Sequence, residues 1–401
     1  MTFSIQPKPH ITNKRTTRSL MLELTAVIGF VALWAIIYNF TLGADFGVKT
    51  LAMIIISVLI SSLSDGLYNL PMLFDKKVVN VGERFKNWGI KILDSYGYVS
   101  GLIFALLLPV GASYYAVIIG AFVGTFLAKS IFGGFAKNVF NPAVVGRVFV
   151  QVCFPSALTV SLDPTVTTGA TVVTGLNNAG WITNDLSVGL GDIFLGTYQG
   201  ALGETLGLAL IIALIYLIVR NIIDWRISAF YLVTCFLTAL AVGLTGGLGA
   251  SSFEYALKFI LIGGILIGAT FCLTDPVTSP TSLVGKIIYA VGAALITCMI
   301  RYQAAAVEGV AYSILIMNML TPLIDKLISD KQDKHLVVKS CVIGGLMLVS
   351  VAFGLTYGSL NKKKTSSYVE SNPVSLREEN KANKTIIANQ EIVLDIEGGN
   401  Y

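Results

Sequence analysis

Residues 21–40 read MLELTAVIGFVALWAIIYNF, a stretch in which Glu23 is the one charged side chain. A helix needs about 20 apolar residues to cross the hydrocarbon core of a bilayer. The run is therefore long enough to form a complete membrane span. It is also too long for the core of a signal peptide and lacks a small-residue cleavage site, so we expect it to remain as the first span.

The composition of the whole chain agrees with a membrane protein. Of its 401 residues, 54% are hydrophobic and 13% are charged, and the mean hydropathy is +0.75. A soluble domain has about 25% charged residues, so an ordinary soluble enzyme and a disordered chain are both excluded. The net charge of +5 comes from short basic clusters between apolar runs. We therefore expect a lipid bilayer, and no nucleic acid, as partner.

The apolar runs predict an all-α integral membrane protein with about ten core transmembrane helices and one extra C-terminal helix. The predicted spans are 21–40, 46–64, 96–109, 112–131, 139–155, 203–219, 228–243, 255–273, 287–301, 309–324 and 339–358. The predicted organisation is a cytoplasmic basic tail (1–20), a first five-helix half (21–155), an outward loop (156–202), a second five-helix half (203–326), the extra helix (339–358), and a polar tail expected to be disordered (359–401).

Basic residues predict the orientation, because short cytoplasmic loops collect Lys and Arg. The clusters are the first tail, the segment 75–91, Lys129 with Lys137, and Arg220 with Arg226. They alternate with loops that are poor in cations, which places the amino terminus inside. The loop 156–202, which contains no Lys or Arg, then faces outward.

Five spans before this loop and five after it predict two halves inserted in opposite directions, an inverted repeat. Tyr115-Ala116-Val117 and Tyr289-Ala290-Val291 begin matching Gly/Ala-rich spans. Non-helical backbone at membrane depth must be covered by protein or line a cavity, so prolines that interrupt or end the apolar runs point to a central site. They are Pro109, Pro142, Pro276, Pro280 and Pro322.

Histidines and cysteines offer little for a metal site. His10 and His335 lie near membrane edges, and the cysteines lie in apolar segments without a C-x-x-C pair. We interpret the cysteines as small buried apolar residues and expect no metal site, so redox chemistry would need a carried cofactor. They are Cys153, Cys235, Cys272, Cys298 and Cys341.

The outward loop contains Asp163-Pro164-Thr165-Val166-Thr167-Thr168-Gly169-Ala170-Thr171. Small residues leave the backbone open to the close approach of a phosphate or another protein, and a hydroxyl on such a segment can be modified. By itself the pattern is equally a Thr-rich turn.

Several polar residues at the predicted helix breaks and span ends are further candidates. Asn138 and Asn141 lie one turn apart before Pro142 and either reach one ligand or cap the broken helix. Asp275 either caps a helix end or contacts a flavin or an ion. Ion-path candidates are Asp325, Glu23 and Glu308, the last opposite Arg301, although each is equally explained as a terminal, snorkelling or paired charge.

Five sequence stretches, taken together, resemble one family. Thr168-Gly169-Ala170-Thr171 is similar to the [S/T]-G-A-T flavinylation signal of the RnfD subunits of Rnf electron-transport complexes and of the related NqrB subunits of the sodium-pumping NADH:quinone reductase. The other four also resemble family stretches: FGG with NVFNPAVVG (132–134, 138–146), TDPVTSPT (274–281), VEGVAY with MN and PLID (307–325), and PHI with Arg18 before the first helix. The short lead before the first span favours the Rnf type, and residues 339–401 depart from the family.

The resemblance implies FMN joined to Thr171 through a phosphoester by a separate transferase, with Thr168, Gly169 and Ala170 as the remainder of the signal. It also suggests a noncovalent riboflavin contacted by Asn138, Asn141 and Asp275. The implied complex contains iron–sulfur subunits and a second flavinylated subunit. It lies in the bacterial cytoplasmic membrane with the FMN loop on the outer face.

The implied function is electron transfer between ferredoxin and NAD, coupled to Na⁺ or H⁺ translocation. No G-x-G-x-x-G followed by an acid is present, so nucleotide chemistry would belong to other subunits. Two alternatives stay open: a quinone-reducing subunit of the sodium-pump type, and a small-solute transporter or channel with inverted repeats.

Overall fold

The computed structural model describes residues 16–74, 80–158, 182, 189–196, 200–303, 309–329 and 336–371. Within these ranges every regular element is a helix, and the isolated β-bridge pairs Pro109 with Ala201. The predicted all-α membrane class is confirmed.

Six of the described helices are long and apolar enough to cross a membrane. Each of them contains one of the predicted spans. They are α1 (Thr17–Leu42), α2 (Ala44–Tyr68), α10 (Trp225–Gly246), α13 (Leu283–Gln303), α14 (Gly309–Ser329) and α15 (Leu336–Ser371). Pro322 lies inside α14, so the prediction that this proline breaks its span is wrong. Membrane helices tolerate proline where neighbouring groups satisfy the freed carbonyl groups.

The remaining predicted spans are short or broken helices. Four short ones are α4 (Gly97–Leu106), α5 (Tyr114–Phe122), which continues as the π-helix η2 (Val123–Ser130), α6 (Pro142–Cys153) and α9 (Gly207–Val219). The predicted continuous span 255–273 is wrong. The chain there forms α11 (Ser252–Leu261), then α12 (Ile265–Ile267) and the π-helix η5 (Gly268–Cys272), with a 61° bend at the break.

Shorter elements occupy segments that the sequence treated as loops. They are η1 (Leu70–Phe74), α3 (Val81–Ser95), η3 (Pro155–Leu158), α8 (Leu190–Leu195) and η4 (Gly249–Ser251). The basic segment 75–91, expected to be an inner loop, thus contains most of an amphipathic helix. The predicted outward loop begins with η3 and holds α8 near its end.

Side chains that satisfy free backbone N–H groups define where several helices begin. The Thr16 hydroxyl accepts a hydrogen bond from Ser19 N at 3.2 Å at the start of α1. Asn80 accepts from Gly82 N at 3.0 Å at the start of α3, and Asp224 accepts from Arg226 N at 3.1 Å at the start of α10. Asn141 caps α6, with Pro142 in the first helical turn.

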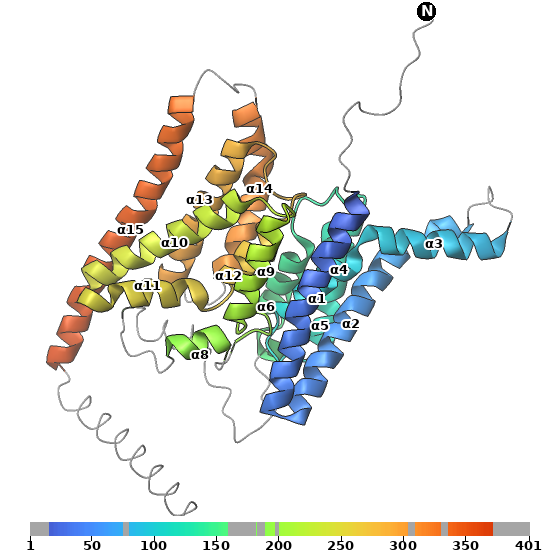
Figure 1. The fold of residues 1–401 in the computed structure, drawn as a ribbon, viewed down its shortest axis with the longest axis horizontal. Helices are drawn as coiled ribbons and strands as arrows, with labels where there is room; N and C mark the ends of the chain where they lie inside the picture. The colour runs from blue at the N-terminus through green and yellow to red at the C-terminus, as the bar shows by residue number, and fades with distance from the viewer. Residues whose placement is uncertain are drawn as a thin grey trace, which may run out of the picture.

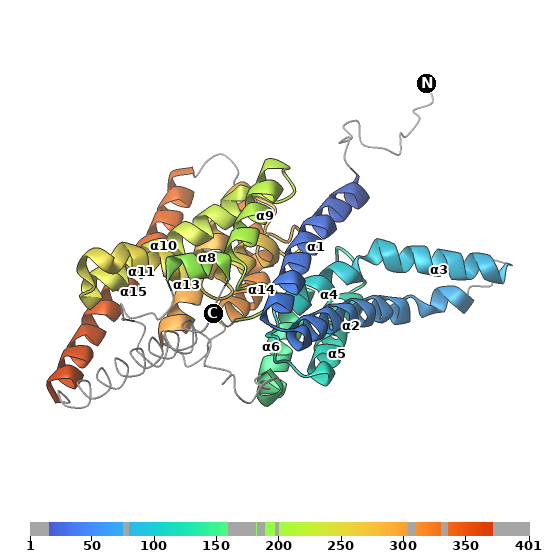
Figure 2. The same cartoon turned by 60° about the horizontal axis from the view of Figure 1, so that its bottom comes forward.

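The helices form two groups that meet along the middle of the molecule (Figures 1 and 2). The first group comprises α1 to α6 and the second α9 to α15, with α9 against α1. Each group has a crosswise helix, α3 or α11, followed by a short helix and a loop with Pro109 or Pro276. This order agrees with two related halves, while their inverted relation stays a prediction.

Both described ends of the outward loop bond to the short connection between α4 and α5. Ser113 N donates to Ala157 O at 2.8 Å on one side. On the other side, Leu202 N donates to Leu108 O at 2.9 Å and Gly203 N donates to Leu106 O at 2.7 Å. These bonds supply partners for carbonyl groups that the broken helix leaves unpaired, as a non-aqueous environment requires.

The break between α11 and α12 is stabilised by a buried arginine. The Arg301 guanidinium of α13, 1% exposed, donates to Phe259 O and Ile262 O, each at 3.2 Å. It also lies 5.2 Å from the centre of the Phe259 ring. A cation at the carboxyl end of α11 satisfies its last carbonyl groups and complements the helix dipole.

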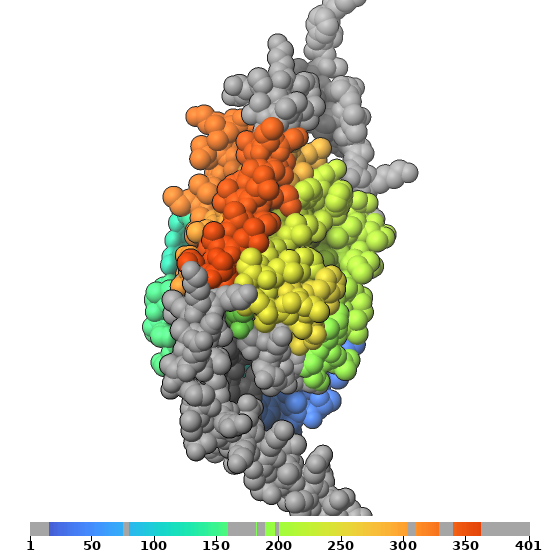
Figure 3. All heavy atoms as spheres, turned by 90° about the vertical axis from the view of Figure 1, so that its left-hand side faces the viewer, coloured from blue at the N-terminus to red at the C-terminus, as the bar shows by residue number. Residues whose placement is uncertain are grey.

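Helix α15 covers an outer face of α10 and α13 (Figure 3). Ser350 and Thr238 share a hydrogen bond of 2.7 Å between their hydroxyl groups, and Gly354 lies against the backbone of Thr238. The helix extends to Ser371, so the prediction that residues from 359 onward are disordered is wrong for residues 359–371. The continuous helix carries the chain past the predicted end of the span.

Replacing Gly354 with Leu should displace α15 from α10. A Cβ atom at this position would lie 2.6 Å from Thr238 O, closer than packing allows. Overpacking of this kind costs about 1–3 kcal/mol, so the thermal midpoint of the purified protein in detergent should fall. Gly344→Leu on the same helix is the matched control, because nothing lies within 4 Å of a Cβ atom there. Equal midpoints for both variants would contradict this packing.

Candidate functional site

A cavity of about 250 Å³ lies where the two groups of helices meet. Its walls come from the start of α1, from α4, from the loop before α6, from the turn between α9 and α10, and from η5 with the loop after it. The lining residues include Thr17, Met21, Tyr96, Ser100, Lys129, Phe135, Asn138, Asn141, Ile222, Ile223, Thr270, Phe271 and Asp275. The structure therefore brings Asn138, Asn141 and Asp275 together, although they come from both predicted halves.

Asn141 is buried and joins the two groups of helices. Its side-chain oxygen accepts from Ala143 N at 3.1 Å and Val144 N at 3.5 Å, which caps α6. Its amide nitrogen donates to Cys272 O at 3.2 Å, at the end of η5. Asn141 thus performs the capping role that the sequence left open and also lines the cavity.

Asn138 is buried at the same wall but has a freer side chain. Its amide nitrogen donates to Phe140 O at 3.1 Å. None of the described residues donates to its carbonyl oxygen. A carboxamide with an unused acceptor beside a cavity can bind the N–H group of a ligand.

Asp275 is half-buried, and its carboxylate is held within its own loop. It accepts from Val277 N at 3.0 Å and from the Thr278 hydroxyl at 3.4 Å. The Thr321 hydroxyl of α14 donates to Thr278 O at 2.9 Å. The loop after η5 is therefore fixed to α14, and Asp275 keeps a defined place in the cavity wall.

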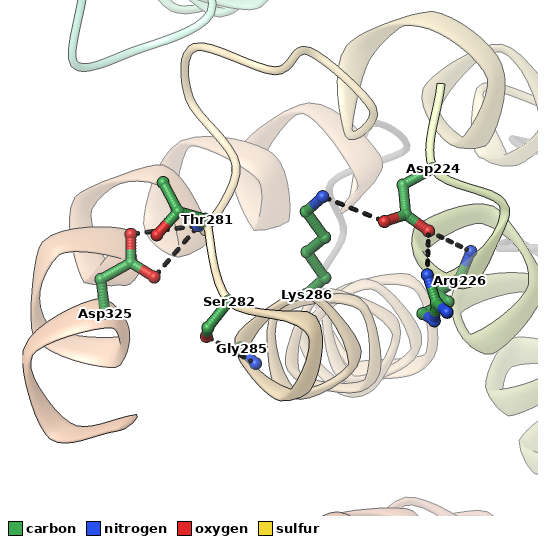
Figure 4. A network of polar contacts seen from close by, with 7 residues as sticks. All are labelled: Asp224, Arg226, Thr281, Ser282, Gly285, Lys286 and Asp325. Carbon is green, nitrogen blue, oxygen red and sulfur yellow. Dashed lines mark hydrogen bonds and ion pairs between the residues drawn. The ribbon is translucent and has the colours of Figure 1, made fainter. Parts of the chain in front are cut away.

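Asp325 of α14 bonds to the far end of the same loop (Figure 4). Both of its carboxylate oxygens accept from Thr281 N, at 3.1 and 3.2 Å. This geometry makes Asp325 an anchor for the loop that carries Asp275. Its role in an ion path stays a prediction.

Asp224, which caps α10, forms the neighbouring polar contact in Figure 4. It accepts from Lys286 Nζ of α13 at 3.0 Å and lies 3.4 Å from Arg226 Nη1. Burial raises the pKa of Asp224, but hydrogen bonds and charges from Lys286 and Arg226 outweigh it, so the pKa lies below its ordinary value. The ionised carboxylate therefore joins the first turns of α10 and α13.

A buried ion pair forms part of the cavity wall behind the flavin candidates. Lys129 Nζ donates to Asp65 Oδ2 at 2.8 Å and also to Ser95 O, and the two charged side chains are 3% and 1% exposed. The Ser130 hydroxyl donates to Asp65 Oδ1 at 3.0 Å. Gly97 of α4 lies against Asp65, where a Cβ atom would clash with the carboxylate.

The interpretation of Lys129 as a loop cation is wrong, because its side chain is buried beneath α4. Lys137, counted with it, is exposed. A lysine inside the predicted span 112–131 was itself the available signal, since an ionisable group at membrane depth is rare without a role. Its partner Asp65, directly after the span 46–64, could not be assigned from the sequence.

Glu23 pairs across the two groups of helices. Arg220 at the end of α9 donates to both of its carboxylate oxygens, through Nη2 at 2.7 Å and Nε at 3.3 Å. Two parallel bonds between a guanidinium and a carboxylate fix geometry as well as charge. Of the two interpretations given for Glu23, the structure shows a paired charge.

Other sequence predictions fall outside the described residues or need correction. Thr168, Gly169, Ala170, Thr171 and Glu308 lie outside the described residues. Among the cysteines, Cys235, Cys272 and Cys298 are buried, but Cys153 and Cys341 are exposed, so the prediction of burial is wrong for these two. Both lie in apolar helices, whose outer faces suit a small apolar residue in a bilayer.

The fold and this site define a multi-pass, all-α membrane protein with a polar cavity between two groups of broken and unbroken helices. The chain matches the NQR2, RnfD, RnfE family over residues 4–334 and belongs to that family. The resemblance drawn from its motifs is thus confirmed. Helix α15 lies beyond the matched residues.

Named relatives support the Rnf branch of the family. The chain is 31% identical to the D subunit of the Na(+)-translocating ferredoxin:NAD(+) oxidoreductase complex of Acetobacterium woodii, over 82% of this chain and 95% of that protein. It is 30% identical to the proton-translocating counterpart of Clostridium ljungdahlii, over 81% and 94%. The B subunit of the Na(+)-translocating NADH-quinone reductase of Ectopseudomonas mendocina is 32% identical, but over 57% and 58%.

Replacing Lys129 with Met should strongly destabilise the protein. The change leaves Asp65 buried without its cation, and breaking a buried ion pair in this way costs about 3–5 kcal/mol. Adding Asp65→Asn should recover much of the loss, because no charge then stays unpaired. Thermal midpoints and size-exclusion profiles in detergent give the measurement. Lys137→Met is the control, and a loss equal to that of Lys129→Met would show that the pair is not responsible.

Proposed function

We propose that this chain is the RnfD-type membrane subunit of an ion-translocating oxidoreductase, within the electron path between ferredoxin and NAD. The single observation that supports this most is the alignment to a relative named for that role over 95% of the relative's length. The chain supplies a membrane-embedded scaffold, and other subunits supply the sites for ferredoxin and the nucleotide.

The proposed electron carrier is FMN esterified to Thr171 in the loop on the outer face. The motif Thr168-Gly169-Ala170-Thr171 provides the hydroxyl and the small neighbours that a transferase needs. Bound there, FMN would accept and donate electrons, while its phosphate serves only as the attachment. The described stems of this loop, at Ala157 and Leu202, are fixed to the connection between α4 and α5.

We propose the cavity as the site of a noncovalent flavin, in agreement with the residues expected for riboflavin. Its wall combines three aromatic rings, Tyr96, Phe135 and Phe271, with the carboxamides of Asn138 and Asn141. Ligand sites of this kind pair apolar walls with a few fixed polar groups. Asn138 would bind the polar edge of the ring through its free acceptor, and Asn141 would hold η5 and α6 at the correct spacing.

Coupling to Na⁺ or H⁺ is part of the same proposal. Two relatives that match over most of their length are named for different ions, one for Na⁺ and one for protons. The names therefore support ion translocation as a class and leave the ion to measurement. Glu23 and Asp325 are occupied by Arg220 and by Thr281 N, so either would enter an ion path only by exchanging these partners.

The quinone-reductase alternative keeps one specific observation in its favour, the 32% identity with a relative of that type. That match covers 58% of the relative, against 95% for the Rnf relative. Quinone-dependent oxidation by the purified complex would favour the alternative.

Thr171→Val should abolish covalent flavin. The protein is produced with its transferase, separated by denaturing electrophoresis and viewed under ultraviolet light, where the unaltered chain should fluoresce. Valine removes the hydroxyl but keeps the shape, so its band should be dark. Thr165→Val, in the same segment, is the control and should stay fluorescent. Fluorescence retained by Thr171→Val would move the attachment to another hydroxyl, and a dark unaltered chain would remove the covalent flavin from the proposal.

Asn138→Val should reduce the riboflavin that co-purifies with the complex and leave the covalent FMN intact. Loss of one hydrogen bond of about 1.4 kcal/mol weakens retention about tenfold. Flavin released by acid is quantified by chromatography, beside in-gel fluorescence for the covalent flavin. Thr171→Val should give the opposite pattern. Riboflavin that is absent from the unaltered complex, or unchanged in Asn138→Val, would contradict a flavin in this cavity.

A further inference from the structure

Helix α3 (Val81–Ser95) differs from the other helices of the first group in its direction. It leaves the end of α2 and lies crosswise to the long helices, and its first half projects beyond the bundle (Figures 1 and 2). It lies on the side of the first group where α1 begins, the side predicted to face the cytoplasm.

One stripe of α3 is firmly attached to the bundle near the middle of the helix. Trp88 Nε1 donates to Gly66 O of α2 at 3.0 Å. Trp88 and Ile92 both pack on Gly66, where a Cβ atom would lie 3.1 Å from each side chain. Arg84 Nη1 lies 3.4 Å from Leu73 O of η1, which orients the projecting part. The helix is therefore held in a fixed direction.

The apolar side chains of α3 continue beyond this attachment. Phe85, one turn before Trp88 and edge-on to it, is 57% exposed, and Leu93 is 58% exposed. Val81 and Ile90 are also exposed, and Phe74 of η1 is 73% exposed. Within the part of the chain that the structure describes, these side chains form an apolar surface at the edge of the bundle.

The charges of α3 are sorted around the helix. At about 100° per residue, Arg84 and Lys91 lie beside Trp88 on one flank of the apolar face, and Lys86 lies beside Leu93 on the other. The acidic residues, Glu83 and Asp94, fall on the polar side, away from Trp88. Cations at the border of an apolar face can extend toward lipid phosphates while their stems stay in contact with apolar chains.

From this arrangement we propose that α3 is an interfacial anchor that binds anionic phospholipid headgroups of the cytoplasmic leaflet. Phe74, Phe85 and Leu93 enter the boundary between headgroups and acyl chains, and Lys86 and Lys91 contact the phosphates. An amphipathic helix in the plane of the interface, with basic residues and buried aromatic side chains, binds by both contributions. The anchor fixes the height of Asp65, which lies one residue before the Gly66 contact.

The test places a fluorescent label on the intact chain in lipid vesicles. The exposed Cys153 and Cys341 are first replaced by Ser. A single cysteine is then introduced by Phe85→Cys or Leu93→Cys, with Asn87→Cys on the polar side as the matched control. Labels at 85 and 93 should be quenched about twofold more than the label at 87 by lipids that carry a nitroxide in the upper acyl chain. Two label sites keep the result readable if one variant fails to fold.

Lipid charge distinguishes an anionic surface from general burial in the bilayer. Quenching is compared in phosphatidylcholine vesicles and in an equimolar mixture with phosphatidylglycerol. The anionic lipid should increase quenching at 85 and 93, and Lys86→Gln with Lys91→Gln should remove the increase. High salt should act in the same direction because exposed charges are screened.

Three results would overturn the proposal: equal quenching at 85 and 87, no dependence on anionic lipid, or loss of quenching in the complete complex. The last would show that a partner protein covers α3.

Discussion

The hydrocarbon of a membrane offers no hydrogen-bond partner to an open backbone, and this constraint governs the structure described above. Every described break in a helix is matched by a group from elsewhere in the chain. Leu202 and Gly203 supply N–H groups to the end of α4, Arg301 supplies its guanidinium to the end of α11, and Asn141 caps α6 while bonding to the end of η5. Each partner is distant in sequence, so the breaks themselves hold the fold together. The polar cavity exists because these breaks converge between the two groups of helices.

The same constraint explains how charges are arranged around the cavity. Lys129 and Asp65 are nearly inaccessible and satisfy each other, with Ser130 and Ser95 completing the set. Glu23 and Arg220 join the two groups at a partly exposed position, where an ion pair contributes less to stability than to alignment. Asp325 and Thr321 fix the loop that carries Asp275. A redox cofactor in this cavity would meet a rigid frame in which each surrounding charge already has a defined partner.

The sequence predicted the long helices well, because twenty apolar residues in a row have few alternatives in water or in lipid. It also predicted that Asn138, Asn141 and Asp275 belong to one site, through motifs rather than through geometry. It failed where neighbouring elements decide the outcome. The break inside 255–273 depends on Arg301, which lies about thirty or more residues further along the chain. Lys129 was assigned to a loop because composition alone does not show that α4 covers it, and the crosswise α3 was hidden within a basic segment. Covalent attachment at Thr171 rests on the motif, since that residue lies outside the described ranges.

The loop on the outer face enters and leaves through stems that pair with the same few residues, Leu106, Leu108 and Ser113. A segment closed in this way resembles a cassette inserted into a frame. The free energy of closing such a segment rises only slowly with its length, so evolution can lengthen, shorten or exchange it while the helices beneath stay unchanged. Engineers could use the same stems as graft points for a different carrier peptide.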